Sequence, residues 1–232
     1  MSSTAINKRH IAVAVARKDL TIEWNSRILV NQVAPFAAIV MVLFAFALDN
    51  DGILLRVAPG LVWLATLFSM LVVVQRSFTV ESADGALDAL RVAGVDMGAI
   101  FVGKAIALMV QLFVLELMLV ATAVVLYGVE MTLAGFCEAI VTLVVATIGL
   151  GSVGTLYGGL AAGARGRETL LPLLLLPAVA PVLIGATRAT EAAFGSGGTT
   201  VSEGWPWIGL LLVFAVLFCA VGTVAFGPLV DE

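Results

Sequence analysis

Few side chains in this sequence could do chemistry, and two acidic ones lie inside long apolar runs. Glu116 falls near the middle of the run 99–127, and Glu138 falls near the outer end of the run 134–162, where it can reach water. Each run is long enough to cross a membrane. An acid within a membrane is costly, so by default it faces the bundle interior or a cavity and is a functional candidate. Glu116 is therefore the intramembrane polar candidate, and the alternative is a structural pairing with another polar group.

Other chemistries lack the residues they need. The segment GAIFVGKA, 98–105, approaches the phosphate-binding pattern G-x-x-x-x-G-K-[ST], but Ala105 replaces the magnesium-binding hydroxyl and no strand is predicted before it. His10 is the only histidine, so this chain alone does not supply an imidazole site for a metal or haem. Cys137 and Cys219 lie in apolar runs and are expected to be packing residues. We expect no catalytic residue, no metal site and no cofactor bound by this chain, so nucleotide hydrolysis must come from another chain.

The elements that carry these residues are predicted to be membrane helices. Of the 232 residues, 61% are hydrophobic and 12% are charged, against about 45–50% and about 25% in a soluble domain. Charged residues are too few to solvate a soluble protein of this size, so lipid is the solvent for most of the chain. We predict an all-α integral membrane protein with a single transmembrane domain over 1–232. Its six predicted spans are 28–48, 57–74, 99–127, 134–162, 170–186 and 205–226.

Lys and Arg residues set the expected orientation, because basic residues resist translocation across a membrane. Nearly all of them precede span one or lie between spans two and three or four and five, which share one side. We therefore expect a multi-pass protein of the cytoplasmic membrane with both termini in the cytoplasm. Lys104, just inside span three at its basic end, is expected to snorkel to the headgroups. The basic residues on the expected cytoplasmic side are Lys8, Arg9, Arg17, Lys18, Arg27, Arg76, Arg91, Arg165 and Arg167.

Two segments outside the spans have helical patterns. In 75–98, Leu87 and Leu90 recur at helical spacing among acidic residues, which predicts a short amphipathic cytoplasmic helix. This periodicity is equally typical of a docking element for a cytoplasmic partner and of an ordinary solvated helix. The segment 8–27 has a weaker pattern and is predicted to be an interfacial helix on the cytoplasmic leaflet. The acidic residues of the first segment are Glu81, Asp84 and Asp88, and the apolar face of the second is expected to be Val13, Leu20 and Trp24.

Small residues and prolines mark spans four and five. Gly154 and Gly158 have the small-xxx-small spacing that lets a neighbouring helix approach closely. Pro177 and Pro181 each remove a backbone donor and favour a kink. We expect spans four and five to form the bent, closely packed part of the bundle.

The expected outer side carries three tryptophans and one long loop. Trp63, Trp205 and Trp207 are predicted to anchor the chain at the membrane interface. The segment 189–204 contains the run GSGGTT and lacks apolar periodicity. It is expected to be a flexible loop, either a linker or a contact for an extracytoplasmic partner.

Five stretches distributed over nearly the whole chain carry a family resemblance. They are ARKDLTIEWNSR before span one, VAPGLVWLATLFSMLVVVQRSF in span two, ESADGALDAL after it, and GSVGTLYGGL and LLPLLLLPAVAPVLIGA in spans four and five. Together they resemble the haem exporter protein B family, the CcmB-type permeases of cytochrome c maturation. The resemblance implies a six-helix permease of the ABC-2 type with a cytoplasmic coupling helix between spans two and three.

The same resemblance implies partners and a coupling surface. A separate cytoplasmic ATPase subunit binds the ATP, and a haem-handling membrane protein loads a haem chaperone, whose release ATP hydrolysis drives. Haem is then a substrate of the complex, and a second copy of this chain is a possible further partner. The resemblance favours docking as the role of 75–98. The residues implied to contact the ATPase subunit are Arg76, Glu81, Asp84, Gly85, Leu87, Asp88 and Leu90.

Three other functions stay open at this point. The element DG-x-L-x-x-L, 84–90, is shared more loosely with other ABC-2 permeases, so the chain could export a drug, a lipid or a polysaccharide. An intramembrane enzyme could use Glu116, although such an enzyme would gather several acids or histidines near one interface. A scaffold would only assemble partners, and charge reversal at Asp84 or Asp88 would then leave ATPase activity intact.

Overall fold

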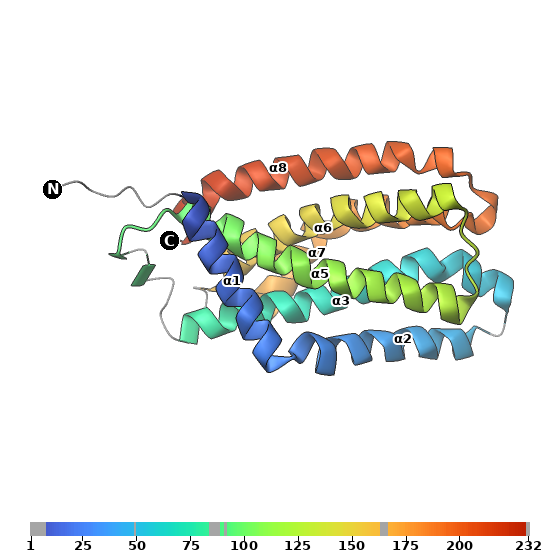
Figure 1. The fold of residues 1–232 in the computed structure, drawn as a ribbon, viewed down its shortest axis with the longest axis horizontal. Coiled ribbons are helices and arrows are strands. Elements are labelled where there is room, and N and C mark those ends of the chain that lie inside the picture. The colour runs from blue at the N-terminus through green and yellow to red at the C-terminus, as the bar shows by residue number, and fades with distance from the viewer. Residues whose placement is uncertain (1–7, 49, 84–88, 91, 163–166, 231–232) are drawn as a thin grey trace.

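The computed structural model describes residues 8–48, 50–83, 89–90, 92–162 and 167–230, and within these ranges the chain is helical without a strand. Long helices lie side by side along one axis, and α1 crosses them obliquely at the end where the described chain both begins and finishes (Figure 1). We call this the α1 end and the opposite one the far end. The helices are α1 (Lys8–Ser26), the short π-helix η1 (Leu29–Val33), α2 (Ala34–Ala47), α3 (Asp51–Ala83), α5 (Met97–Tyr127), α6 (Leu133–Ala162), α7 (Arg167–Ala193), the 3-10 turns η2 (Ser196–Gly198) and η3 (Val201–Glu203), and α8 (Trp205–Val230).

The prediction of six spans is confirmed. Within the described ranges, six helical stretches are long and apolar enough to cross a membrane. Two helices extend well beyond their predicted spans, because helical structure continues into polar sequence where hydropathy falls. α3 continues past 74 to Ala83, and α7 continues past 186 to Ala193. The six stretches are Leu29–Ala47, Gly52–Thr79, Met97–Tyr127, Leu133–Ala162, Thr169–Ala193 and Val201–Leu229.

The predicted N-terminal helix is present as α1, and its fully buried residues are small, with Ile11 and Val15 partly buried against the bundle beside them. Ala12 and Ala16 are buried, whereas Val13 and Trp24 are exposed. α1 ends where Arg27 adopts a left-handed backbone conformation with φ 51°. There the Glu23 carboxylate accepts a hydrogen bond of 2.6 Å from the Leu29 backbone N–H, which closes the turn into the first span.

α6 is the central helix and packs against α3, α5, α7 and α8. A Cβ atom added at Gly154 would lie 2.7 Å from Met70 Cε, and one added at Gly158 would lie 2.5 Å from the Phe78 ring. Both of these neighbours belong to α3, so the two glycines let α3 approach α6. The nearest neighbours of these two glycines are thus on span two, and for Gly154 also on span three, but not on span five.

The prolines of α7 lie away from this close contact. Pro177 and Pro181 are exposed, whereas Leu175 and Val179 of the same helix are buried in the bundle. α7 is one continuous helix over Arg167–Ala193 with both prolines inside it. The two prolines thus occupy the outward side of the helix and not its packed side.

The far end is more ordered than predicted. Trp63 is buried and donates its indole N–H to Thr190 Oγ1 at 2.8 Å, so its prediction as an interface anchor is wrong. The Ser196 hydroxyl donates to the Leu55 carbonyl at 3.0 Å, and the Thr199 hydroxyl donates to the Glu191 carbonyl at 2.9 Å. The segment 189–204 is therefore not a flexible loop: it comprises the end of α7 and the turns η2 and η3, fastened to α3 and α7.

Candidate functional site: the junction of α1, α3 and α5

The predicted coupling segment begins as a continuation of α3 and not as a separate helix. α3 has 33 residues, which at about 1.5 Å per residue make it about 50 Å long, more than the membrane core of about 30 Å. A helix of that length, with polar residues in its last turns, is long enough to project beyond the membrane. Arg76 is partly exposed near this end, and Glu81 lies in the last turn. Their positions relative to the bundle are therefore set by the rigid helix that carries them.

Of the remaining predicted coupling residues, the structure describes only Leu90. Leu90 is partly buried and packs against the hydrophobic core of the bundle. Asp84, Gly85, Leu87 and Asp88 lie outside the described residues. Of the predicted segment 75–98, the structure thus describes residues 75–83, 89–90 and 92–98.

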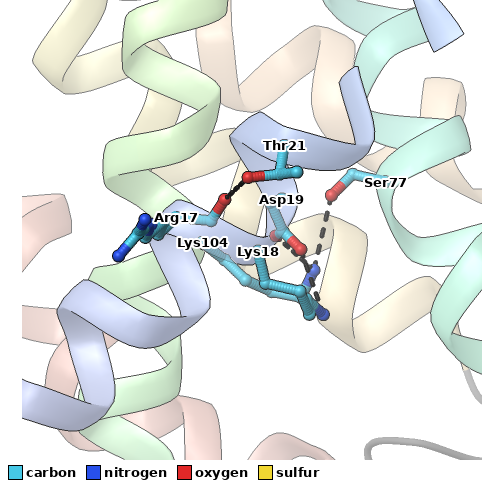
Figure 2. Close-up of polar contacts among 6 residues, drawn as sticks. All are labelled: Arg17, Lys18, Asp19, Thr21, Ser77 and Lys104. Atoms are coloured by element: carbon cyan, nitrogen blue, oxygen red, sulfur yellow. Dashed lines mark hydrogen bonds and ion pairs between the residues drawn. The ribbon is translucent and has the colours of Figure 1, made fainter. Parts of the chain in front are cut away.

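A buried ion pair lies beside the end of α3. The Lys104 ammonium on α5 is 3.1 Å from Asp19 Oδ2 on α1, and the two side chains are only 1% and 10% exposed. The Lys104 ammonium also donates to the Ser77 hydroxyl at 3.4 Å (Figure 2). It lies 4.6 Å from the centre of the Phe78 ring, and Ser77 and Phe78 both belong to α3. The expectation that Lys104 snorkels to the headgroups is therefore wrong. α1 covers this side chain and supplies its counter-ion.

Small residues bring α1 close enough to make this pair. A Cβ atom at Gly103 would lie 2.5 Å from the Ala12 carbonyl oxygen and 2.7 Å from Val15 Cβ, so any larger residue would push α1 away from α5. Ala12, Ala16 and Asp19 recur at i, i+4 and i+7 and share one face of α1. The face that packs against α5 consequently carries the carboxylate towards Lys104.

Exposed charges surround the buried pair. Lys18 lies 3.0 Å from Asp19 Oδ1 and is 43% exposed, whereas the Arg17 side chain points away from the junction (Figure 2). A small hollow of about 30 Å³ beside the pair is lined by Arg76 and Gln111 among others. That volume has room for about one water molecule. The junction is thus a polar contact between three helices and too small to be a substrate pocket.

A second ion pair joins α1 to α5 nearer the surface. Lys8 Nζ lies 2.7 Å from Asp96 Oδ2, with side chains 75% and 34% exposed. Asp96 also caps α5 by accepting a hydrogen bond of 2.8 Å from the Ala99 backbone N–H. The hydrogen bonds from Lys8 and Ala99 lower the pKa of Asp96 below its ordinary value.

The two intramembrane acids lie apart from this junction. Glu116 is fully buried and accepts a hydrogen bond of 2.5 Å from the Thr147 hydroxyl on α6, which is the kind of polar partner that the pairing alternative requires. It is twelve residues beyond Lys104 on α5, about 18 Å along the helix. Glu138 is also fully buried, so the expectation that it reaches water is wrong. Among the described residues, neither Glu138 oxygen has a hydrogen-bond partner.

The junction of α1, α3 and α5 is held by one buried ion pair, one hydroxyl and one aromatic ring. Among the described residues, no three His, Cys, Asp or Glu side chains come together to hold a metal. Sequence reasoning missed Asp19, Ser77 and Phe78 as functional candidates. The available signal was Lys104 itself, because a lysine inside a span usually requires a nearby acid.

Comparison with known proteins places this architecture in one family. The family model described as "CcmB protein" matches residues 10–231. The chain is 28% identical to Heme exporter protein B of Haemophilus influenzae over 219 residues, 94% of both chains. It is 35% identical to Heme exporter protein B of Rhodobacter capsulatus over 164 residues, 69% of this chain and 73% of that protein. It is 30% identical to Heme exporter protein B of Escherichia coli K12 over 160 residues, 68% and 71% of the two chains.

Proposed function

Because the chain belongs to the CcmB family, we propose that it is the membrane permease subunit of an ABC complex that handles haem for cytochrome c maturation. The observation that carries the proposal is the match over 10–231, together with six helices long and apolar enough to cross a membrane. The relatives are named as haem exporters, so the alternative function, export of a drug, lipid or polysaccharide, is not favoured. The permease role assigns ATP hydrolysis to another subunit, so this chain is not itself an enzyme.

The end of α3 and the segment after it are the proposed docking surface for the ATPase subunit. α3 is long enough to carry Arg76 and Glu81 out of the membrane, and their neighbours in sequence continue the acidic pattern. A short acidic and apolar element of this kind fits a groove on a partner protein. The proposed contacts are Arg76, Glu81, Asp84, Gly85, Leu87, Asp88 and Leu90.

The remaining partners follow from the same proposal. Haem is the substrate of the complex, ATP binds the ATPase subunit, and ATP hydrolysis drives release of a haem-loaded chaperone supplied by a haem-handling membrane protein. The α1 end, which carries most basic residues, faces the cytoplasm, so both termini are cytoplasmic in the cell membrane. Six helices rarely enclose a path alone, so a second copy or another membrane chain completes the assembly.

Deletion of the gene tests the haem assignment. We expect cells without it to lose covalently bound haem from c-type cytochromes, and expression of the chain from a plasmid to restore it. Staining of membrane proteins for covalent haem measures the effect. Unchanged c-type cytochromes in the deletion strain would refute the assignment.

Charge reversal tests the docking surface separately. Asp84→Lys and Asp88→Lys should reduce co-purification of the ATPase subunit in mild detergent. Glu130→Lys is the matched control, because Glu130 is an exposed acid that follows α5 at the far end. Equal recovery of the ATPase subunit with all three variants would contradict docking at this segment.

A further inference from the structure

We propose that the Lys104–Asp19 pair positions α1 and α5 relative to the end of α3, and so transmits movement of the ATPase-docking segment into the membrane bundle. The inference rests on the proposed function, since it assumes that an ATPase subunit moves this segment. Lys104 is a positioning residue in this proposal and contacts no substrate. The property assigned to it is transmission between helices, beyond holding the bundle together.

Packing of α1 against α5 does not by itself require this ion pair. Moving two charges out of water is costly, and well-packed apolar residues of similar volume are often as stabilising as a buried ion pair. α1 and α5 already meet through Ala12, Ala16 and Gly103, whose small size allows close approach without any charge. Small residues can make the contact between α1 and α5 without the ion pair. The pair therefore serves to fix the orientation of the two helices relative to each other.

Lys104 contacts α3 close to the proposed docking residues. Ser77 and Phe78, which contact the Lys104 ammonium, directly follow Arg76 and precede Glu81 by about one helical turn. A helix is stiff over so short a distance, so displacement of Glu81 displaces Ser77 and Phe78 with it. Because the Lys104 ammonium contacts Ser77 and Phe78, their displacement moves Lys104. Asp19, its ion-pair partner, then moves α1.

The contact at Phe78 continues to α6, in the centre of the bundle. The Phe78 ring lies against Gly158 of α6, where an added Cβ would approach it to 2.5 Å. A hollow of about 320 Å³ also borders Phe78 and is lined by Gly158 and Leu171 among others, so the ring has free space on that side. The Lys104 ammonium and Gly158 limit the ring only in the directions in which they contact it. The junction thus connects four helices, α1, α3, α5 and α6, through one lysine and one aromatic ring.

The experiment compares output with ATP consumption in the intact complex. Lys104→Met with Asp19→Leu replaces the pair by apolar side chains, and Lys104→Arg keeps the charge. Lys8→Met is the matched control, because it removes an exposed ion pair between the same two helices and leaves the Ala99 cap of Asp96 in place. Each variant is measured for ATPase subunit recovered, for ATP hydrolysed by the purified complex, and for covalent haem on c-type cytochromes.

We expect the apolar double variant to bind the ATPase subunit and hydrolyse ATP, but to form about tenfold less covalent haem per ATP hydrolysed, within the range of measured coupling effects. Lys104→Arg and Lys8→Met should keep the ratio within about twofold of the parent. A double variant with the parental ratio would overturn the proposal. If the parent complex hydrolyses ATP normally and gene deletion leaves cytochromes unchanged, the haem assignment fails instead.

Ser77→Ala keeps the proposal testable if the double variant does not accumulate. It removes one hydroxyl on α3 and leaves the ion pair and the α1–α5 contact intact. We expect the membrane to contain normal amounts of this variant. The covalent haem formed per ATP hydrolysed should fall about threefold, a loss of the size that one hydrogen bond supplies. An unchanged ratio in Ser77→Ala, together with loss of the double variant from the membrane, would reduce the pair to a purely structural role.

Discussion

Substitution of Gly158 by alanine tests the close contact between α6 and α3. The added Cβ would lie 2.5 and 2.6 Å from two carbons of the Phe78 ring and 2.8 Å from Val74 Cγ1. Carbon atoms prefer separations of about 3.5–4.0 Å, so the ring or the whole helix must retreat by about 1 Å. Overpacking of this kind costs about 1–3 kcal/mol. Alanine recovers about 0.5–1 kcal/mol through its higher helix propensity, which leaves a net loss of about 1 kcal/mol.

Gly209→Ala is the matched control, since Gly209 lies in a spanning helix, α8, and has nothing within 4 Å of its added Cβ. Only the propensity gain applies there, so the two variants should differ by about 2 kcal/mol, the cost of the clash. For a chain of this size the difference corresponds to about 4–8 °C in Tm, measured by thermal unfolding in mild detergent. Phe78→Leu should relieve part of the loss in the Gly158→Ala background. Equal Tm values for the two alanine variants, or no relief by Phe78→Leu, would refute the packing argument.

Three further outcomes follow from single contacts. Glu116→Gln keeps the side-chain volume and the hydroxyl partner on α6, so we expect a Tm change worth at most about 1 kcal/mol and normal covalent haem. Loss of haem with an intact fold would instead require a carboxylate there. The bond from Lys8 lowers the pKa of Asp96, so its stabilising effect is present above about pH 4 and is lost as the pH falls through the lower folded-state value. Asp96→Asn should abolish this loss of Tm at acid pH. An unchanged dependence of Tm on pH would contradict the stabilising role of the Asp96 carboxylate. Thr190→Val removes the acceptor of the buried Trp63 N–H and should cost about 1–3 kcal/mol in thermal unfolding, whereas an unaltered Tm would show that the bond is dispensable.

The spans could be predicted from sequence because hydropathy acts over about twenty neighbouring residues and needs no knowledge of the fold. Their ends could not be located as well. α7 continues to Ala193 through ATRATEAA, which is too polar for a hydropathy window but rich in residues that favour helix. α3 likewise continues through polar residues to Ala83. Helix ends depend on propensity and tertiary contacts, and hydropathy reports neither.

The two wrong predictions about Trp63 and Lys104 share a physical cause. Each side chain has an apolar body and a polar tip, so each suits either the membrane interface or the protein interior if the tip finds a partner. Thr190 lies 127 residues from Trp63, and Asp19 lies 85 residues from Lys104. Local periodicity contains no information about partners at such separations. Only the packing of α3 against α7, and of α1 against α5, decides between the two environments.

α3 contacts Gly154, which the sequence predicts to be a packing residue, and also Thr190 and Lys104, whose contacts with α3 the sequence does not predict. At the far end Trp63 bonds α7, in the middle Met70 lies against Gly154 of α6, and at the α1 end Ser77 receives a hydrogen bond from Lys104. A rigid helix fixed at three levels moves as a unit, so a force applied at its projecting end reaches all three contacts. In the proposed coupling, the Trp63–Thr190 bond at the far end opposes a force applied at the α1 end. Weakening it by Thr190→Val should therefore alter coupling to ATP hydrolysis as well as stability, which distinguishes a transmitting helix from a passive one.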